Sequence, residues 1–287
     1  MPCDADLSWV GPDVTSGKGA GDENFPVGTL LISRQHRGHV MAYYHFARCI
    51  DDIADDPTLP PDQKAARLSA MNAILHGADA PTGRRDAATA ETLHQHFKKL
   101  DLPYEVASDL ITAFQQDVTK SRYANWAELV DYCRYSANPV GRFLLLLHGE
   151  SKDILPLSDA LCTALQVINH LQDVSTDLKR LDRCYLPQDF LSQEGAEARD
   201  AALSHSKPGL RRVFDRMLDE VDSLNDQAAT LPPLIRNRRM RIYTAIIVAL
   251  SHHLARRLRR EDPVASRVKL SIWDVVRSLG TASRRLI

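Results

Sequence analysis

Apolar residues recur at intervals of three and four along most of the chain from Asn24 onward. This spacing places them on one face of an α-helix, whereas a half-buried strand would show alternation at every second residue. Alternating runs of β-branched residues are almost absent, so the pattern predicts an all-α protein. The clearest helical stretches are HVMAYYHFARCIDDIADD, LHQHFKKL, EVASDLITAFQQDVTK, WAELVDYCRYSANPVGRFLLLLHG, LSDALCTALQVINHLQDVSTDLKR, LRRVFDRMLDEVDSLNDQAATL and MRIYTAIIVALSHHLARRLRR.

Segments rich in Pro, Gly and Asp separate these stretches and are expected to be loops. They fall at 57–61, 76–86, 156, 184–190, 204–209 and 232–233. None is long enough to be a linker, which favours one domain over residues 23–287. Residues 1–22 are rich in Gly, Asp and Ser with little apolar content, and we expect them to form a mobile leader.

Charge and cysteine content narrow the classes of function. The chain has 36 basic and 37 acidic residues and a net charge of -1, so nucleic acid is not an expected partner. Its five cysteines are scattered without a CxxC pair, which argues against a disulfide framework and a zinc site and favours a cytoplasmic protein. No apolar run approaches the roughly 20 residues needed to span a bilayer.

The stretch FARCIDDIADD combines an apolar helix with a group of carboxylates. Asp51 and Asp55 lie one helical turn apart and share a face, and Asp52 borders it. Arg48 stands on the same surface one turn earlier, and Tyr44 continues the stripe. A solvated helix end would also explain an isolated acidic run, although carboxylates face the negative end of the helix dipole there.

A second oxygen-bearing stripe has the same design. In NHLQDVSTD, Asn169, Asp173 and Asp177 recur every fourth residue of an otherwise mostly apolar helix. The two stripes can meet if their helices face each other across a bundle. Carboxylate and amide oxygens are hard ligands that suit Mg²⁺, which usually bridges a few protein carboxylates to substrate phosphates. The pattern therefore predicts Mg²⁺ as cofactor and a phosphate-bearing substrate.

Basic residues beside the stripes could bind phosphate oxygens that the metal leaves free. They are Arg48, Lys179, Arg180 and Arg183. Taken singly, each is more often a surface residue or a local ion-pair partner. Only Arg48 has a position that favours a phosphate contact by itself.

RCIDDIAD and NHLQDVSTD resemble the two aspartate-rich motifs of the squalene/phytoene synthase family, the head-to-head branch of the trans-isoprenyl diphosphate synthase fold. The likeness extends through NFPVGTLL, YCRYSANPVGR and RCYLP in the same order. It implies a single-domain isoprenoid-synthase helical bundle with a central apolar cavity. ENFPV and SANPVGR look most like the bacterial branch of hopanoid biosynthesis, which converts presqualene diphosphate and water to hydroxysqualene and diphosphate.

The resemblance also implies roles for individual residues. The implied Mg²⁺ ligands are Asp51, Asp52, Asp55, Asn169, Asp173 and Asp177. The implied catalytic residues are Asp51, Asp55, Asp173, Tyr44 and Tyr132. Arg48, Phe25 and Gln166 match substrate-binding positions, and their motifs add Asn138 and Arg183 as candidates. One departure is Gln172, where relatives often carry arginine, so a diphosphate or cofactor contact is missing or replaced.

Several alternatives remain open from the sequence. Presqualene diphosphate, squalene or phytoene-type synthesis would use the same motifs, and some proteins of this fold are non-catalytic accessory proteins that have lost their aspartates. Retention of both stripes favours an enzyme. A di-iron bundle would need a second Glu-x-x-His pair beside Glu91 and His94, and none exists.

Two arginine runs, RNRRMR and RRLRR, flank the apolar segment IYTAIIVAL. Such runs would suit peripheral contact with anionic lipid. A solvated basic helix face is the favoured alternative. The sequence leaves the oligomeric state open.

Overall fold

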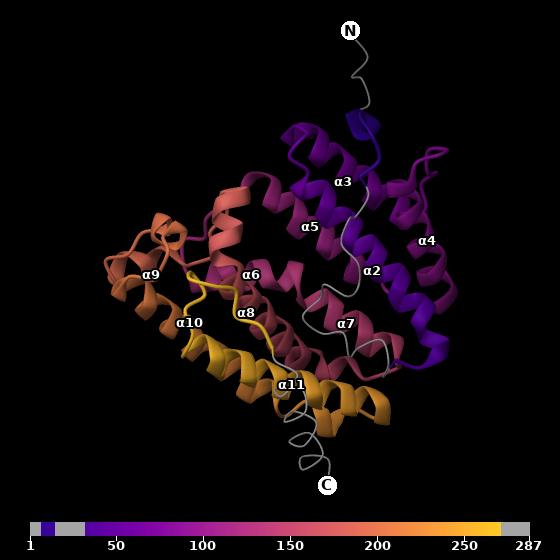
Figure 1. Cartoon of the computed structure of the whole chain (residues 1–287). Coiled ribbons are helices and arrows are strands. Elements are labelled where there is room, and N and C mark those ends of the chain that lie inside the picture. Colours follow the sequence, from indigo (N-terminus) through magenta and orange to yellow (C-terminus); the bar gives the residue numbers. More distant parts are fainter. Residues whose placement is uncertain (1–6, 15–31, 271–287) are drawn as a thin grey trace. The chain divides into compact units, whose positions relative to one another are not determined.

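The computed structural model describes residues 7–14 and 32–270, which fall into two compact units divided after Lys120. Both units are built from helices (Figure 1). The described residues contain no strand, only one isolated parallel bridge between Arg122 and Cys184. The all-α prediction is confirmed. No helix in these two ranges is long and apolar enough to cross a membrane.

The first unit is centred on one long helix, α2, which packs against the three α-helices that follow it. Phe46, Ile50 and Ile53 of α2 are completely buried, because they repeat every third or fourth residue and so share one helical face. The elements of this unit are η1 (Leu7–Trp9), α2 (Arg34–Asp55), α3 (Pro61–Leu75), α4 (Arg85–Leu100) and α5 (Glu105–Thr119).

A buried arginine ties residues 7–14 to this unit. The Arg67 guanidinium on α3 is fully buried and donates to the carbonyls of Ser8 and Pro12, each at 3.1 Å. The Asp86 carboxylate, 3.4 Å from Arg67, balances its charge. The described residues of the expected leader are therefore held against α3, while the rest of that expectation lies outside the described ranges.

The second unit surrounds helix α8, which packs against α6, α7, α10 and α11. The neighbours cover α8 on several sides, so residues around most of its circumference are buried, among them Ala164, Ile168 and Leu171. The elements are α6 (Trp126–Ser136), α7 (Asn138–Leu147), η2 (Lys152–Ile154), α8 (Leu155–Leu181), α9 (Gln188–Gln193), η3 (Ala198–Ala202), α10 (Pro208–Ala228), η4 (Pro232–Leu234) and α11 (Arg238–Leu258).

The stretch WAELVDYCRYSANPVGRFLLLLHG, which reads as one helix, is two. Helix α6 ends at Ser136 and α7 begins at Asn138. Proline is tolerated in the first turn of a helix but disrupts its interior, so Pro139 requires a restart there. The following turn of α7 lies very close to α8. A Cβ at Gly141 would clash with the side chains of Ser158 and Cys162.

Candidate functional site

The carboxylates of α2 lie beside an arginine of the same helix. Nη1 of Arg48 donates to Oδ2 of Asp51 at 2.7 Å, and Nη2 donates to Oδ1 of Asp52 at 3.3 Å. These pairs have the i, i+3 and i, i+4 spacing of one helical face. The structure therefore brings Arg48 into contact with two aspartates of the first predicted stripe, Asp51 and Asp52.

Asp51 has the most perturbed carboxyl group of this stripe. Burial and the neighbouring Asp55 charge raise the pKa of Asp51 to about 7, although Arg48 acts in the opposite direction. Asp52 and Asp117 add further negative charge. The stripe thus places several carboxylates around the carboxyl group of Asp51, which suits a site for a cation.

The second predicted stripe lies on α8. Asn169, Asp173 and Asp177 are all partly exposed, whereas the intervening Leu171 and Val174 are buried. The polar stripe therefore occupies the side of α8 that the core of this unit leaves open. This arrangement follows from the four-residue spacing of the three oxygen-bearing side chains.

Asp173 has a partner that the sequence did not indicate. Nε of Arg267 lies 2.6 Å from Oδ1 of Asp173, and Nη2 of Arg267 donates to Oδ2 at 2.8 Å. The preceding helical position, Gln172, is buried and its Nε2 donates to the carbonyl of Val268 at 2.5 Å. Gln172 thus holds the segment that brings Arg267 to the stripe.

A buried aromatic cluster lies in the same unit. The Tyr132 ring centroid is 5.3 Å from that of Tyr123, 5.5 Å from that of Tyr185 and 6.0 Å from that of His170. His170 stacks on Tyr185 with 3.6 Å between centroids. Burial and the charge of Arg183 lower the pKa of His170 to about 3, so this imidazole is neutral. The cluster therefore consists of uncharged aromatic rings, whose π faces can attract a cation without repulsion from a protonated histidine.

The remaining predicted residues lie in several places. Tyr44 is partly exposed on α2, with its ring 5.7 Å from that of His45. Gln166 is partly exposed on α8, one turn before Asn169. Arg183 is buried just after α8. Phe25 lies outside the described residues.

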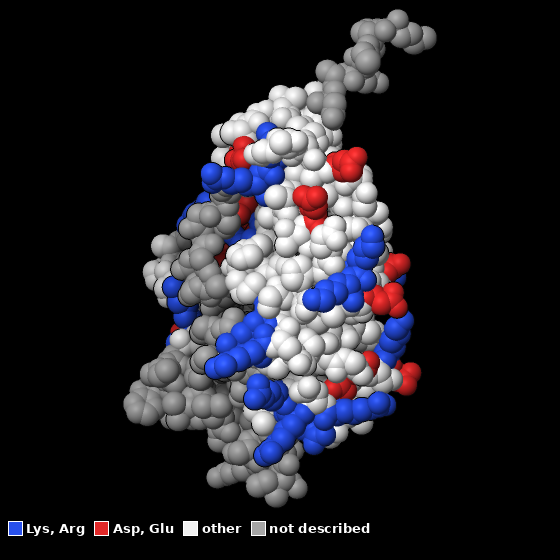
Figure 2. Space-filling model, turned by 90° about the vertical axis from the view of Figure 1, so that its right-hand side faces the viewer, with Lys and Arg blue, Asp and Glu red and all other residues white. Residues whose placement is uncertain are grey.

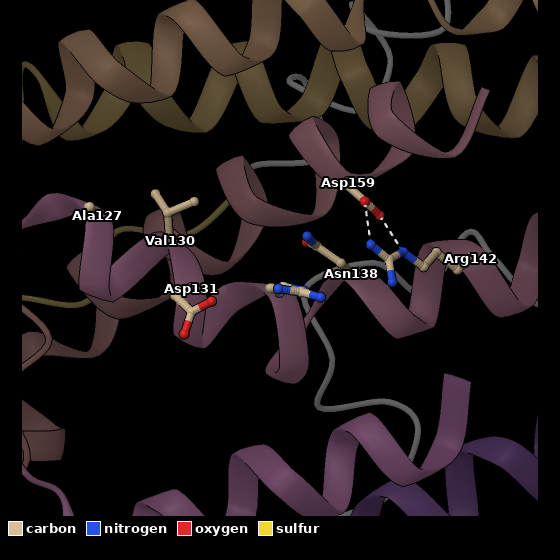
Figure 3. A pocket seen from close by; sticks show the side chains of 7 residues that line it. Ala127, Val130, Asp131, Asn138, Arg142 and Asp159 are labelled. Atoms are coloured by element: carbon tan, nitrogen blue, oxygen red, sulfur yellow. Dashed lines mark hydrogen bonds and ion pairs between the residues drawn. The ribbon is translucent and has the colours of Figure 1, made fainter. Parts of the chain in front are cut away.

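Asn138 lies at a pocket of about 340 Å³ formed by α6, α7 and the start of α8 (Figure 3). Its Oδ1 accepts a hydrogen bond from Thr163 at 3.0 Å, and Arg142 forms a two-bond ion pair with Asp159 at 2.8 and 2.6 Å. Tyr132 is not one of the residues that line this pocket. The structure does not bring Asn138 and Tyr132 together there.

The donor chemistry of the two stripes fits Mg²⁺ that shares its ligands with a substrate. Within residues 7–14 and 32–270, no three His, Cys, Asp or Glu side chains are placed to hold a metal by themselves. Oδ2 of Asp52 is nevertheless buried and accepts no hydrogen bond from the described residues. Mg²⁺ commonly takes only one or two carboxylates and completes its shell with water and phosphate oxygens, so these donors suit it.

The fold and these residues can be compared with known proteins. A hydroxysqualene synthase from Rhodopseudomonas palustris is 39% identical over 278 residues, covering 96% of this chain and 93% of the relative. One from Zymomonas mobilis is 40% identical over 255 residues, covering 89% and 85%. The crystal structure of a squalene synthase from Alicyclobacillus acidocaldarius aligns with a TM-score of 0.73 at 33% identity, covering 84% and 90%.

A structure of a dehydrosqualene synthase with a bound ligand has the same fold, with a TM-score of 0.72 at 20% identity and 92% coverage of each chain. The family description squalene/phytoene synthase matches residues 19–274. This match includes both oxygen-bearing stripes, the aromatic cluster and Arg267. The chain therefore belongs to the squalene/phytoene synthase family.

Proposed function

We propose that this protein is a hydroxysqualene synthase that converts presqualene diphosphate and water to hydroxysqualene and diphosphate. The observation that carries this proposal is the retention of both oxygen-bearing stripes, on α2 and α8, in a chain about 40% identical to hydroxysqualene synthases. An accessory protein that had lost catalysis would have no physical reason to keep neighbouring like charges on the α2 helix, since their repulsion is unfavourable.

The first task of such a site is to bind the diphosphate. Asp51, Asp52 and Asp55 on α2 and Asn169, Asp173 and Asp177 on α8 are the proposed Mg²⁺ ligands. Bound Mg²⁺ would neutralise the leaving diphosphate as a Lewis acid. Arg48 and Arg183 are proposed to bind the phosphate oxygens that Mg²⁺ would leave free, because a guanidinium group suits phosphate geometry.

Arg267 is a further proposed diphosphate ligand. Its planar guanidinium already binds both oxygens of Asp173, and the same fork geometry suits two phosphate oxygens. Gln172 donates a hydrogen bond to the carbonyl of Val268, the residue after Arg267, and so limits the positions that the Arg267 side chain can take. We propose that Arg267 supplies the contact that an arginine at position 172 supplies in relatives.

The second task is to protect a carbocation. The carbon–oxygen bond to diphosphate breaks, and the diphosphate leaves with the electron pair. The resulting cation rearranges, a water oxygen then attacks it, and the water proton passes to solvent. Tyr132 and the rings around it are proposed to shield the cation, because aromatic faces attract cations by about 0.5–2 kcal/mol each and exclude water. Tyr44 is proposed to contribute similarly, and Gln166 and Phe25 to contact the substrate.

The proposal is tested with purified protein, Mg²⁺ and presqualene diphosphate in the absence of NADPH. We expect an alcohol of hydroxysqualene mass by mass spectrometry, together with one diphosphate per turnover. Farnesyl diphosphate offered separately identifies any earlier condensation activity. Formation of squalene only with NADPH would identify a different branch of the family, and failure to release any diphosphate would overturn the enzymatic assignment.

A further inference from the structure

The corner between η4 and the start of α11 carries exposed arginines beside exposed apolar side chains. It consists of Pro233, Leu234, Arg236, Arg238 and Arg239, all of them exposed. Leu234 is 52% exposed, the largest exposed fraction among the large hydrophobic side chains that the structure describes. Basic side chains gather over this end of α11 at the bottom of the view in Figure 2. We call these five residues the η4–α11 corner.

The arginines of the corner are not used to stabilise the fold. Arg236, Arg238 and Arg239 have no carboxylate partner in the described part of the chain. Arg238 and Arg239 also occupy the first turn of α11, where the positive end of the helix dipole disfavours a cation. Three unpaired cations at a helix N-terminus are therefore mildly unfavourable in the free protein, and an anionic surface would relieve them.

At the C-terminal end of α11, by contrast, two arginines form ion pairs. Arg257 forms an ion pair with Glu261 at 2.6 Å, and Arg259 binds both Asp219 and Asp222 at 2.7 Å. The two arginine runs of the sequence thus have different environments. Arg257 and Arg259 of the second run are paired with carboxylates of their own unit, whereas Arg236, Arg238 and Arg239 of the first run present their charge outward.

The corner is held rigidly. The buried carboxylate of Glu150 accepts the backbone N–H groups of Arg236 at 2.9 Å and Asn237 at 2.7 Å. The Asn237 side chain in turn caps the first turn of α11. Ile235 and Met240 pack into the core on either side of these bonds. The exposed side chains are therefore presented from a fixed backbone, which reduces the entropy lost when they bind a surface.

We propose that the η4–α11 corner docks on the surface of an anionic lipid bilayer. The guanidinium groups would bind headgroup phosphates, and Leu234 and Pro233 would enter the boundary of the acyl region. The apolar segment of α11 itself takes no part, because Ile246, Ile247 and Val248 are buried in the core of the unit. This inference is independent of the proposed function, since none of the corner residues belongs to the proposed catalytic or substrate-binding set.

Co-sedimentation of the full chain with vesicles tests the proposal. Vesicles containing about one third phosphatidylglycerol are compared with pure phosphatidylcholine vesicles at the same lipid concentration. Each arginine near such a surface contributes roughly a fivefold factor in binding, so the Arg236→Gln, Arg238→Gln, Arg239→Gln triple variant should lose about 100-fold in partition coefficient. Leu234→Ser should lose several-fold on the same vesicles.

A matched triple variant at the other end, Arg256→Gln, Arg260→Gln, Lys269→Gln, removes the same charge from exposed positions and should bind like the wild type. Circular dichroism verifies that each variant is folded. Glycerol phosphate in solution should not compete at millimolar concentration if a bilayer rather than a free phosphate is bound. Equal binding to neutral vesicles, equal losses in the two triple variants, or no binding of wild-type protein would each overturn the proposal, as would charge-dependent capture only by a soluble acidic protein.

Discussion

The acidic stripes of α2 and α8 are paired with arginines from very different places in the sequence. On α2 the cation is Arg48, one turn before Asp51 on the same helix. On α8 it is Arg267, which lies 94 residues beyond Asp173 in the sequence. The first pair is fixed by helical spacing alone, whereas the second requires the chain after α11 to return to α8. An ion pair between residues one helical turn apart can therefore be predicted from the sequence, whereas one between distant residues depends on tertiary packing.

The largest effect should come from removing one carboxylate from each stripe. Asp51→Asn and Asp173→Asn preserve side-chain size but remove a charge that the proposed diphosphate site needs. Loss of a single group that stabilises a leaving anion typically costs about 100- to 1000-fold in rate. We expect both variants to lose at least about 100-fold in kcat, measured by diphosphate release with presqualene diphosphate and Mg²⁺.

Asp56→Asn is the matched control for this first prediction. Asp56 follows α2 directly, but its Oδ1 accepts hydrogen bonds from the backbone N–H and hydroxyl of Thr58 at 2.7 and 2.6 Å, so it is tied to a turn. Its substitution should leave kcat within about twofold of the wild-type value. Full activity in either Asp51→Asn or Asp173→Asn, with unchanged far-ultraviolet circular dichroism, would remove that stripe from the site.

Much of the fold could be predicted from the sequence because its helices are strongly periodic. The stripe on α8 lies within one helix, from Leu155 to Leu181, and its exposed and buried sides follow the spacing of the residues. The break between α6 and α7 was missed because apolar residues continue across it. Pro139 was the available signal, since a proline inside an apparent helix usually marks a first turn.

The site could be predicted only where its contacts are local. Gln172 and Arg267 are far apart in sequence, and neither has a periodic pattern that would reveal their relation. The departure at Gln172 indicated that a contact was missing or replaced but not where the replacement came from. Only the folded position of Val268, which accepts the hydrogen bond from Gln172, places Arg267 beside Asp173.

A double-mutant cycle can test whether Gln172 and Arg267 act together. Arg267→Gln should lower kcat/KM about tenfold, which is the loss expected for one charge-assisted phosphate contact. Gln172→Leu should cause a smaller loss because Arg267 remains but its segment is less well fixed. If Gln172 acts by positioning Arg267, the double variant should be no worse than Arg267→Gln alone.

The control for the cycle is Arg260→Gln, an exposed arginine of the same unit with no role in the proposed site. It should leave kcat/KM unchanged. Additive losses in the double variant would show that Gln172 contributes independently of Arg267. A change confined to kcat with no effect on KM in Gln172→Leu would also contradict a positioning role toward substrate binding.

The smallest expected effect of the two Asp→Asn substitutions is on the free energy of unfolding of the metal-free protein. It distinguishes the two stripes most directly, because the two substitutions should change this free energy in opposite directions. Burial and the Asp55 charge raise the pKa of Asp51 to about 7, so between roughly pH 4 and 7 the folded state holds a proton that the unfolded state releases. Stability conferred by that proton is present at low pH and is lost as the pH rises through 7. Without solvent screening this pKa change would be worth about 4 kcal/mol, but the Asp51 side chain is 28% exposed, so Asp51→Asn should stabilise the metal-free protein by only about 1 kcal/mol at pH 8 and by little at pH 4.

Asp173→Asn should have the opposite sign because it removes the partner of Arg267. The side chains of Arg267 and Asp173 are 37% and 21% exposed, and such partly solvated pairs contribute about 0.5 kcal/mol. Urea unfolding with EDTA at pH 4 and pH 8 measures both free energies. Arg48 keeps Asp52 as a partner in the Asp51 variant, so the gain there is not offset by an unpaired cation. Destabilisation of the same size in both variants at pH 8 would contradict this prediction. It would mean that the negative charge of Asp51 is balanced by neighbouring cations as well as the charge of Asp173 is.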